Sequence, residues 1–307
     1  MGPTMRKFIM LLVGITTATV AAAQSAAMKP FELNMDRVKV SNFGGNFSSS
    51  KTYLIPTVNL VVSARGSVWA KSGGAKAHGK YYVDGLSKPM LQELSRKLQD
   101  DLVTRMRAAG YTVLTYEDVK GEPDVASHSL NKPDQRYGLP TTGGLGMPVT
   151  FVVATPTDAQ AFDSPIQGPA WWLRGIAKAK DLIVIVPEIK FTVPQMFGET
   201  ESGYKRDSAG IATDPAMVFE GAAIYGVNAK GGTPSIQVQR HGKRLAAEVT
   251  GTIRKVSEDK TTFSAVWETT SGDFVMTLDP TAFTDGILRV GYAVNGLILA
   301  EAAKGRR

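Results

Sequence analysis

Hydrophobic residues between positions 88 and 109 recur every three or four residues, which is the spacing that places them on one face of an α-helix. Ser87 suits the N-cap, Pro89 the first turn, and Gly110 the left-handed stop after the last turn. Charged residues of both signs fill the opposite face, which indicates a solvated surface. The sequence therefore predicts a long amphipathic helix over about 88–109. Its apolar stripe consists of Leu91, Leu94, Leu98, Leu102 and Met106.

The stretches around this helix favour β-strands. Residues 111–116 follow Gly110 directly, so we expect this strand to lie in the sheet on which the helix packs. Residues 53–64 and 67–70 are typical of strands, residues 71–79 of a small basic turn, and residues 81–83 of a short strand. The apolar run 182–186 predicts a central strand covered on both faces, and strict alternation from Glu188 to Val193 predicts one face turned to water.

Three stretches lack a regular pattern. Residues 24–52 are expected to form a flexible N-terminal segment. Residues 120–148 contain four prolines and predict a long loop whose role the sequence does not define. Residues 198–214 predict a polar loop and a possible boundary within the domain.

From Met217 onward, short strands alternate with turn residues, which is typical of an antiparallel meander. Asp279 and Pro280 then open a predicted C-terminal helix, and residues 303–307 are expected to be a disordered tail. The predicted fold class is α+β. It comprises a mixed sheet, the helix at about 88–109, a C-terminal antiparallel meander and a C-terminal helix, within a single domain over 53–302.

The N-terminus has the three parts of a secretory signal peptide. Arg6 and Lys7 precede an apolar run over 8–20, and three alanines ending at Ala23 offer a cleavage site before Gln24. We therefore expect residues 1–23 to be a signal peptide, and the mature chain to be periplasmic or secreted after cleavage near Ala23. The sequence predicts no transmembrane segment in the mature chain, because no later stretch is read as long and apolar enough.

The chain has 307 residues, a formal net charge of +7 and no cysteine. Loss of Arg6 and Lys7 with the signal peptide lowers the charge to +5, a mild excess for which we expect no nucleic-acid partner. Without cysteine an exported protein has no disulfide bonds, so its stability rests on a hydrophobic core.

The sequence contains few residues that point to catalysis. His78, His128 and His241 are far apart in predicted loops and without metal-ligand spacing, so we expect no metal site and no cofactor. No G-x-S-x-G motif nominates a nucleophile, although a Ser-His-Asp triad from distant segments stays open. Glu188 follows a buried strand, where catalytic residues often lie; the alternative is a solvent-facing or ion-paired glutamate.

Two groups of aromatic residues are candidate binding sites. Trp171 and Trp172 lie on a predicted short helix over 169–180 and point about 100° apart. Either the helix is deeply embedded and both are buried, or one of them is exposed as a surface anchor. The second group combines aromatic and basic residues that suit a polyanion or a glycan, or an ordinary surface loop. It consists of Trp69, Tyr81, Tyr82, Lys71, Lys76 and Lys80.

The order of the predicted elements resembles that of the periplasmic α/β domains of bacterial envelope-assembly proteins, such as the curli-secretion lipoprotein family. The resemblance covers mainly residues 86–119, a helix followed by a strand, and residues 177–193, the central strand. The lipid-attachment cysteine of that family is missing here, and the 120–148 loop has no counterpart. The resemblance implies an exported assembly protein and transfers no site residue.

The sequence predicts an exported, non-catalytic binding or assembly component of the bacterial cell envelope, with an envelope protein or polymer as partner and an undefined oligomeric state. The alternatives are a hydrolase acting on envelope polymers and a soluble periplasmic ligand carrier. An assembly protein should show an apolar or aromatic surface patch or an unpaired sheet edge. An enzyme should show clustered acids and histidine in a deep cleft, and a carrier should show a closed apolar pocket.

Overall fold

The helix α2 (Lys88–Ala108) of this computed structural model confirms the long amphipathic helix that the sequence predicts. The Ser87 side chain accepts a hydrogen bond from the Met90 amide at the N-cap. Gly110 has a φ of 80°, the left-handed conformation expected of a helix stop. All five residues of the predicted apolar stripe are buried.

The structure describes residues 30–307 except residues 74, 129–136, 144–146, 163–167, 203–206, 241–248, 258–261, 264–266, 270–271 and 305–307. The chain divides into two compact units, residues 1–30 and 31–307, and the elements below all belong to the second unit. The predicted signal peptide and its cleavage site lie outside the described residues.

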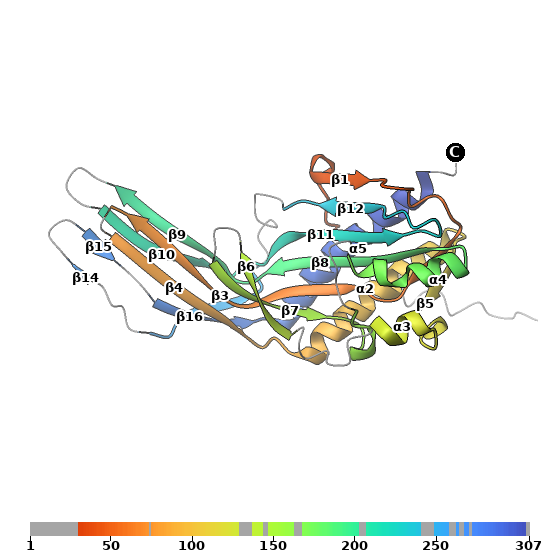
Figure 1. Ribbon diagram of the computed structural model, residues 1–307. Coiled ribbons are helices and arrows are strands. Elements are labelled where there is room, and N and C mark those ends of the chain that lie inside the picture. Colours follow the sequence, from red (N-terminus) through yellow and green to blue (C-terminus); the bar gives the residue numbers. More distant parts are fainter. Residues whose placement is uncertain are drawn as a thin grey trace, which may run out of the picture. The chain divides into compact units, whose positions relative to one another are not determined.

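A mixed sheet of twelve strands forms the framework of this unit (Figure 1). The central strand β8 runs parallel to β2 and β3 and antiparallel to β11. The main path of the sheet is β1-β12-β11-β8-β3-β4-β16-β13, and the other four strands pair at its side. The twelve strands are β1 (Val38–Ser41), β2 (Thr52–Ile55), β3 (Asn59–Ser72), β4 (Ala75–Asp84), β5 (Thr112–Thr115), β6 (Tyr137–Gly143), β7 (Met147–Ala154), β8 (Ile183–Thr192), β11 (Val218–Val227), β12 (Ser235–Val238), β13 (Gly251–Lys255) and β16 (Gly272–Leu278).

Strand β8 follows the burial pattern that its sequence predicts. Its first five residues are buried, and the remaining five alternate between half-buried and buried. The change occurs at Glu188, where the apolar run gives way to alternation. The strand is therefore covered on both faces at its start and on one face at its end.

The predicted C-terminal helix is confirmed as α5 (Pro280–Ala303), which packs against α2. The two helices approach closely where Gly291 faces Leu98, because a Cβ at position 291 would overlap the Leu98 side chain. Asn295 adds a polar link, since its Nδ2 donates to the Leu98 carbonyl and to Asp101 Oδ2, both at 2.9 Å. This contact joins the two long helices into one layer on the sheet.

Helix α5 is also the one helix among the described residues that is long and apolar enough to cross a membrane by length and composition. Most of this stretch is buried inside the unit, and a core helix of a soluble protein passes the same test. The predicted absence of a transmembrane segment in the mature chain stays a prediction.

Short helices cover the other face of the sheet. They are α3 (Pro123–His128), the 3₁₀-helix η5 (Pro169–Leu173) and α4 (Arg174–Ala179). Figure 1 shows α4 in front of the sheet and α5 behind it. Leu173 and Ile176 enter a buried cluster with Val184 and Val186 of β8, so this layer is fixed to the centre of the sheet.

A second sheet has the order β14-β15-β10-β9, and it corrects one expectation. The polar loop predicted over 198–214 is wrong, because β9 (Gln195–Ser202) and β10 (Asp207–Asp214) pair there as an antiparallel hairpin. The other two strands, β14 (Thr262–Phe263) and β15 (Trp267–Thr269), are short. Alanine and glycine in β10 favour strands weakly, which hid this hairpin in the sequence.

Three other stretches contain more regular structure than the sequence predicts. Residues 120–148 include α3 and β6 in place of one long loop. Residues 71–79 form strands up to Ser72 and again from Ala75, so the predicted turn is far shorter. Within residues 24–52, the 3₁₀-helix η1 (Met35–Arg37) leads into β1, which pairs with β12. Of the strands after 217, β11 pairs with β12 and β14 with β15 in chain order, as in a meander. The strands β13 and β16 depart from this order, because β13 pairs with β16 and β16 runs parallel to β4.

Candidate binding surface

The strands β3 and β4 form a hairpin with two chemically different faces. Cross-strand pairs such as Trp69 with His78 and Ser67 with Lys80 place alternate residues on one side. In Figure 1 the far end of this hairpin lies beside β9 and β10, away from the helices. The side that carries the aromatic and basic residues is called the hairpin face below. It consists of Arg65, Trp69, Lys71, Lys76, His78, Lys80 and Tyr82.

The opposite side of the hairpin packs on β9 and β10 through very small residues. Ala70, Ala75 and Ala77 form a buried cluster with Ala209 of β10. A Cβ at Gly198 would lie 2.7 Å from the Trp69 carbonyl oxygen, so only glycine permits this approach. This packing fixes the alternation, and it directs the larger side chains to the hairpin face.

Two large aromatic side chains of the hairpin face are exposed. Trp69 is 55% exposed and Tyr82 is 49% exposed, although both are large enough to be favoured in a core. The Trp69 ring stacks on the His78 ring with centroids 3.9 Å apart and planes 22° apart. Exposed aromatic rings held by a neighbour are typical of binding surfaces.

Tyr81 does not join this surface. It lies on the inner side of β4, where it is buried under Gly66. Burial raises the pKa of the Tyr81 hydroxyl, and its hydrogen bond with Ser63 opposes this shift. Of the three aromatic residues that the sequence places together here, the structure brings together Trp69 and Tyr82.

The charge of the hairpin face is mainly positive. Lys80 stands beside Asp273 of β16, and Asp84 ends the same row. Partial burial and then the charge of Lys80 lower the pKa of His78, with Asp273 opposing them. His78 therefore gains a proton only below its usual range, and its protonation adds charge to the face. The cations of the face are Arg65, Lys71, Lys76 and Lys80, against the two acids Asp84 and Asp273.

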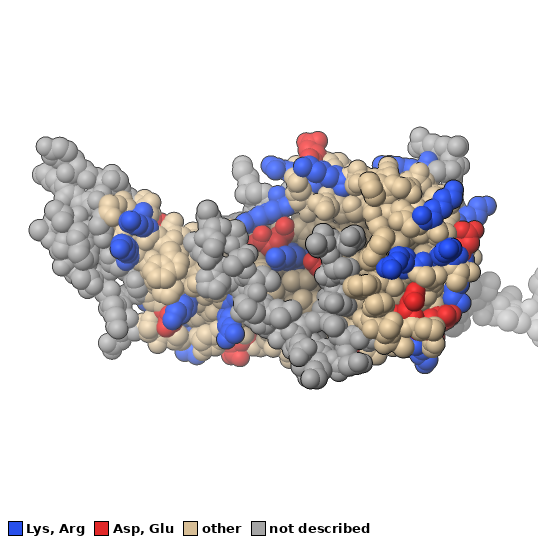
Figure 2. Space-filling model, in the orientation of Figure 1, with Lys and Arg blue, Asp and Glu red and all other residues tan. Residues whose placement is uncertain are grey.

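Charge alone does not single out a binding site on this protein. On the side of the molecule shown in Figure 2, Lys and Arg lie among Asp and Glu over the described surface. What distinguishes the hairpin face is the combination of cations with exposed aromatic rings on one side of two strands.

Trp171 and Trp172, the other predicted site, lie in η5 and are half-buried. Trp171 packs against the buried cluster below it and carries the Arg174 guanidinium 4.7 Å above its ring. Trp172 stacks on His128 with centroids 4.3 Å apart. Their role as a surface anchor stays a prediction.

Among the described residues, Glu188, His78 and His128 lie in three separate elements, β8, β4 and α3. Glu188 is half-buried in β8 opposite Asn59 and Ala223. Burial, and after it the charge of Glu188, raises the pKa of Tyr225. In the described part of the chain, no three His, Asp or Glu residues are placed to hold a metal ion, and His241 lies outside that part.

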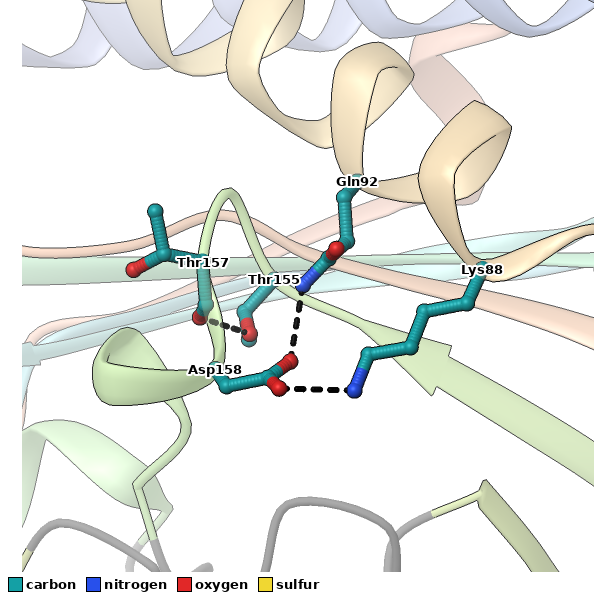
Figure 3. A network of polar contacts seen from close by, with 5 residues as sticks. All are labelled: Lys88, Gln92, Thr155, Thr157 and Asp158. Carbon is teal, nitrogen blue, oxygen red and sulfur yellow. Dashed lines mark hydrogen bonds and ion pairs between the residues drawn. The ribbon is translucent and has the colours of Figure 1, made fainter.

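The sequence did not predict a polar network between α2 and the 3₁₀-helix η4 (Asp158–Gln160). Asp158 accepts hydrogen bonds from Lys88 Nζ at 2.7 Å and from Gln92 Nε2 at 2.8 Å, as Figure 3 shows. Thr155 Oγ1 donates to the Thr157 carbonyl at 2.8 Å. The two contacts of Asp158 join residues 66 and 70 positions apart, so no local pattern signals them.

Comparisons of the chain with protein-family models, with curated proteins and with solved structures found no match. The resemblance to the curli-secretion lipoprotein family and the envelope localisation stay predictions.

Proposed function

We propose that the protein is an exported, non-catalytic binding or assembly component of the cell envelope, and that its hairpin face binds an anionic envelope polymer. The observation that carries this proposal is the exposure of Trp69 and Tyr82 among lysines on one side of a hairpin. Export is the expectation from the N-terminal sequence, and it limits the partners to the envelope.

The form of the hairpin supports binding by a flat surface. Lysines attract an anionic polymer over a range of about 8–10 Å at ordinary ionic strength, and aromatic rings add contact area at low entropic cost. The small residues behind them keep the strand register fixed, so the cations and rings are held in place before a partner arrives. A long polymer meets several such side chains at once.

The test uses inorganic polyphosphate as an anionic probe and dextran as its neutral counterpart, with binding measured by titration calorimetry. We expect the polyphosphate to bind with an affinity that falls as salt rises. Substitution of Lys71, Lys76 and Lys80 by Gln should lower the slope of log K against log salt by about 2–3. Trp69→Ala should weaken binding about thirtyfold, the equivalent of ~2 kcal/mol.

The control replaces three exposed lysines of the body, Lys97, Lys178 and Lys230, by Gln, which changes the net charge equally. If this variant loses as much affinity as the hairpin variant, overall charge and not the hairpin face causes the binding. Cleavage of an envelope polymer by the purified protein would instead favour the hydrolase alternative.

A further inference from the structure

A cavity of about 390 Å³ opens beside the C-terminal half of α2. Asp100 and Thr104 of α2 line one side. Tyr116, from the 3₁₀-helix η2 (Tyr116–Asp118), lines another, and Thr157 and Gln160 line a third. The volume is in the range of small-molecule sites, and the cavity shares no residue with the hairpin face.

The cavity lies where sheet topology favours a binding site. The strands β2 and β5 are parallel, and Ile55 and Thr115 are opposite each other at their carboxyl ends. In open sheets of this kind, ligands bind in the crevice outside the carboxyl ends of the strands. Gln99 donates to the Ile55 carbonyl and Gln160 to the Pro56 carbonyl, each at 2.8 Å. These two amides anchor the cavity to the ends of the strands.

The walls of the cavity are held to one another by hydrogen bonds. Gln160 Nε2 also donates to Gln99 Oε1 at 3.2 Å, and Thr157 Oγ1 donates to Gln160 Oε1 at 2.9 Å. Just beyond Thr157, the ion pair and hydrogen bond of Asp158 join the same loop to the first turns of α2 (Figure 3). The site is therefore preorganised, which reduces the entropy lost on binding.

The charges of the lining balance, which disfavours an ionic ligand. Arg96 and Arg107 face Asp100 and Glu117 around the cavity. Both arginines and Glu117 have partners at 2.7–2.8 Å, in Glu93, the Val113 carbonyl and Lys120. The lining also offers hydroxyl and amide groups, each of which donates or accepts hydrogen bonds.

We propose that this cavity binds a neutral saccharide unit, with the sugar ring against Tyr116 and its hydroxyls on Asp100 and Thr104. A hydroxyl both donates and accepts, so it matches the mixture of acceptors and donors here better than a phosphate or an ammonium group does. Tyr116 is half-buried and packs against the core cluster, so its ring is a fixed apolar surface for the sugar carbons.

Desolvation raises the pKa of the Asp100 carboxyl, with Arg96 opposing and Glu93 adding to the shift. A hydrogen bond donated by a sugar hydroxyl offsets the cost of this desolvation, because it stabilises the carboxylate. Since the carboxylate is a charged acceptor, its bond to the sugar is stronger than a bond between neutral groups.

The experiment uses N-acetylglucosamine and its β-1,4-linked dimer as probes, with glycerol phosphate as an anionic competitor. Saturation-transfer NMR reports binding, and amide shifts report its place. We expect saturable binding with shifts confined to the cavity residues of α2, η2 and η4. If no saturation transfer is seen at sugar concentrations up to ~10 mM, binding is too weak for a functional site and the proposal is overturned. Displacement of the sugar by an equal concentration of glycerol phosphate also overturns the proposal.

Two variants locate the site. Asp100→Asn should weaken sugar binding about tenfold, since the charged acceptor is lost at constant shape. Thr104→Val removes only the hydroxyl, and it should also weaken sugar binding. Asp285→Asn, an exposed carboxyl on α5, is the matched control and should bind as the wild type does.

If Asp100→Asn and Thr104→Val both bind the sugar as tightly as the wild type, the cavity is not the site. Substitution of the three hairpin lysines should leave sugar binding unchanged. The failure of one proposal is thereby distinguished from the failure of the other.

Discussion

The contact between α2 and α5 allows one quantitative test of the packing. Leu98 is fully buried and lies opposite Gly291. A Cβ at position 291 would lie deep inside van der Waals contact with Leu98 Cδ2, 3.0 Å from Cδ1 and 3.2 Å from Cγ. Because three atoms of the leucine are close, rotation about its last bond does not clear the overlap. The perturbation is therefore Gly291→Ala, alone and together with Leu98→Ala.

Each single change has a definite expected cost. Leu98→Ala removes a buried side chain and should lower the free energy of unfolding by ~2–5 kcal/mol. Gly291→Ala gains ~1 kcal/mol of helix propensity but overpacks the contact at a cost of ~1–3 kcal/mol, so its net effect should be a loss of ~0–2 kcal/mol. In the double variant the alanine methyl enters the space that leucine leaves. The loss of unfolding free energy in the double variant should then be smaller than the sum of the two single losses by ~1–3 kcal/mol.

The assay is equilibrium unfolding in urea followed by circular dichroism, with the m-value checked for constancy. Gly296→Ala on the same helix is the matched control, since nothing lies within 4 Å of a Cβ there, and it should stabilise the fold by up to ~1 kcal/mol. Additivity of the Leu98 and Gly291 effects within ~0.5 kcal/mol would refute the close contact. A stabilising Gly291→Ala would do the same.

Three further predictions concern other parts of the chain. N-terminal sequencing of material from the periplasm should begin at or near Gln24, and a chain that still begins at Met1 contradicts the signal peptide. The pKa of His78 measured by NMR should lie below 6.5, because burial and Lys80 disfavour its charged form; the fold should then lose stability as pH falls through that pKa, while polyphosphate binding strengthens. Trp171→Ala and Trp172→Ala should each leave the melting temperature nearly unchanged if the tryptophans are anchors. A loss of ~3–5 kcal/mol in both would assign them to the core.

Periodicity predicts those parts of the fold that rest on a single long element. The stripe of α2 and the change from an apolar run to alternation at Glu188 are both visible in the sequence, because burial follows the helix and strand periods directly. Pairing between strands is not visible. The parallel contact of β16 with β4 joins residues nearly 200 positions apart, and nothing local encodes it.

The candidate surface could be predicted only in part, for a physical reason. Trp69 and Tyr82 are visible as aromatic residues, but their shared side depends on the register of β3 and β4. The sequence between them predicts a turn over 71–79, because alanine and glycine favour strands weakly. Reading Ala75, Ala77 and Gly79 as the small partners of an alternating strand would have placed Tyr81 on the inner side. The saccharide cavity needs three distant segments, so only the folded chain shows it.

The small residues behind the hairpin face separate two kinds of change. Ala70, Ala75 and Ala77 admit almost no substitution, because β10 lies directly against them. Trp69 and Tyr82 alternate with them and are exposed, so substitutions there should cost the fold far less. Substitutions at Trp69 and Tyr82, in evolution or in a designed library, should therefore change the binding partner while the fold stays the same.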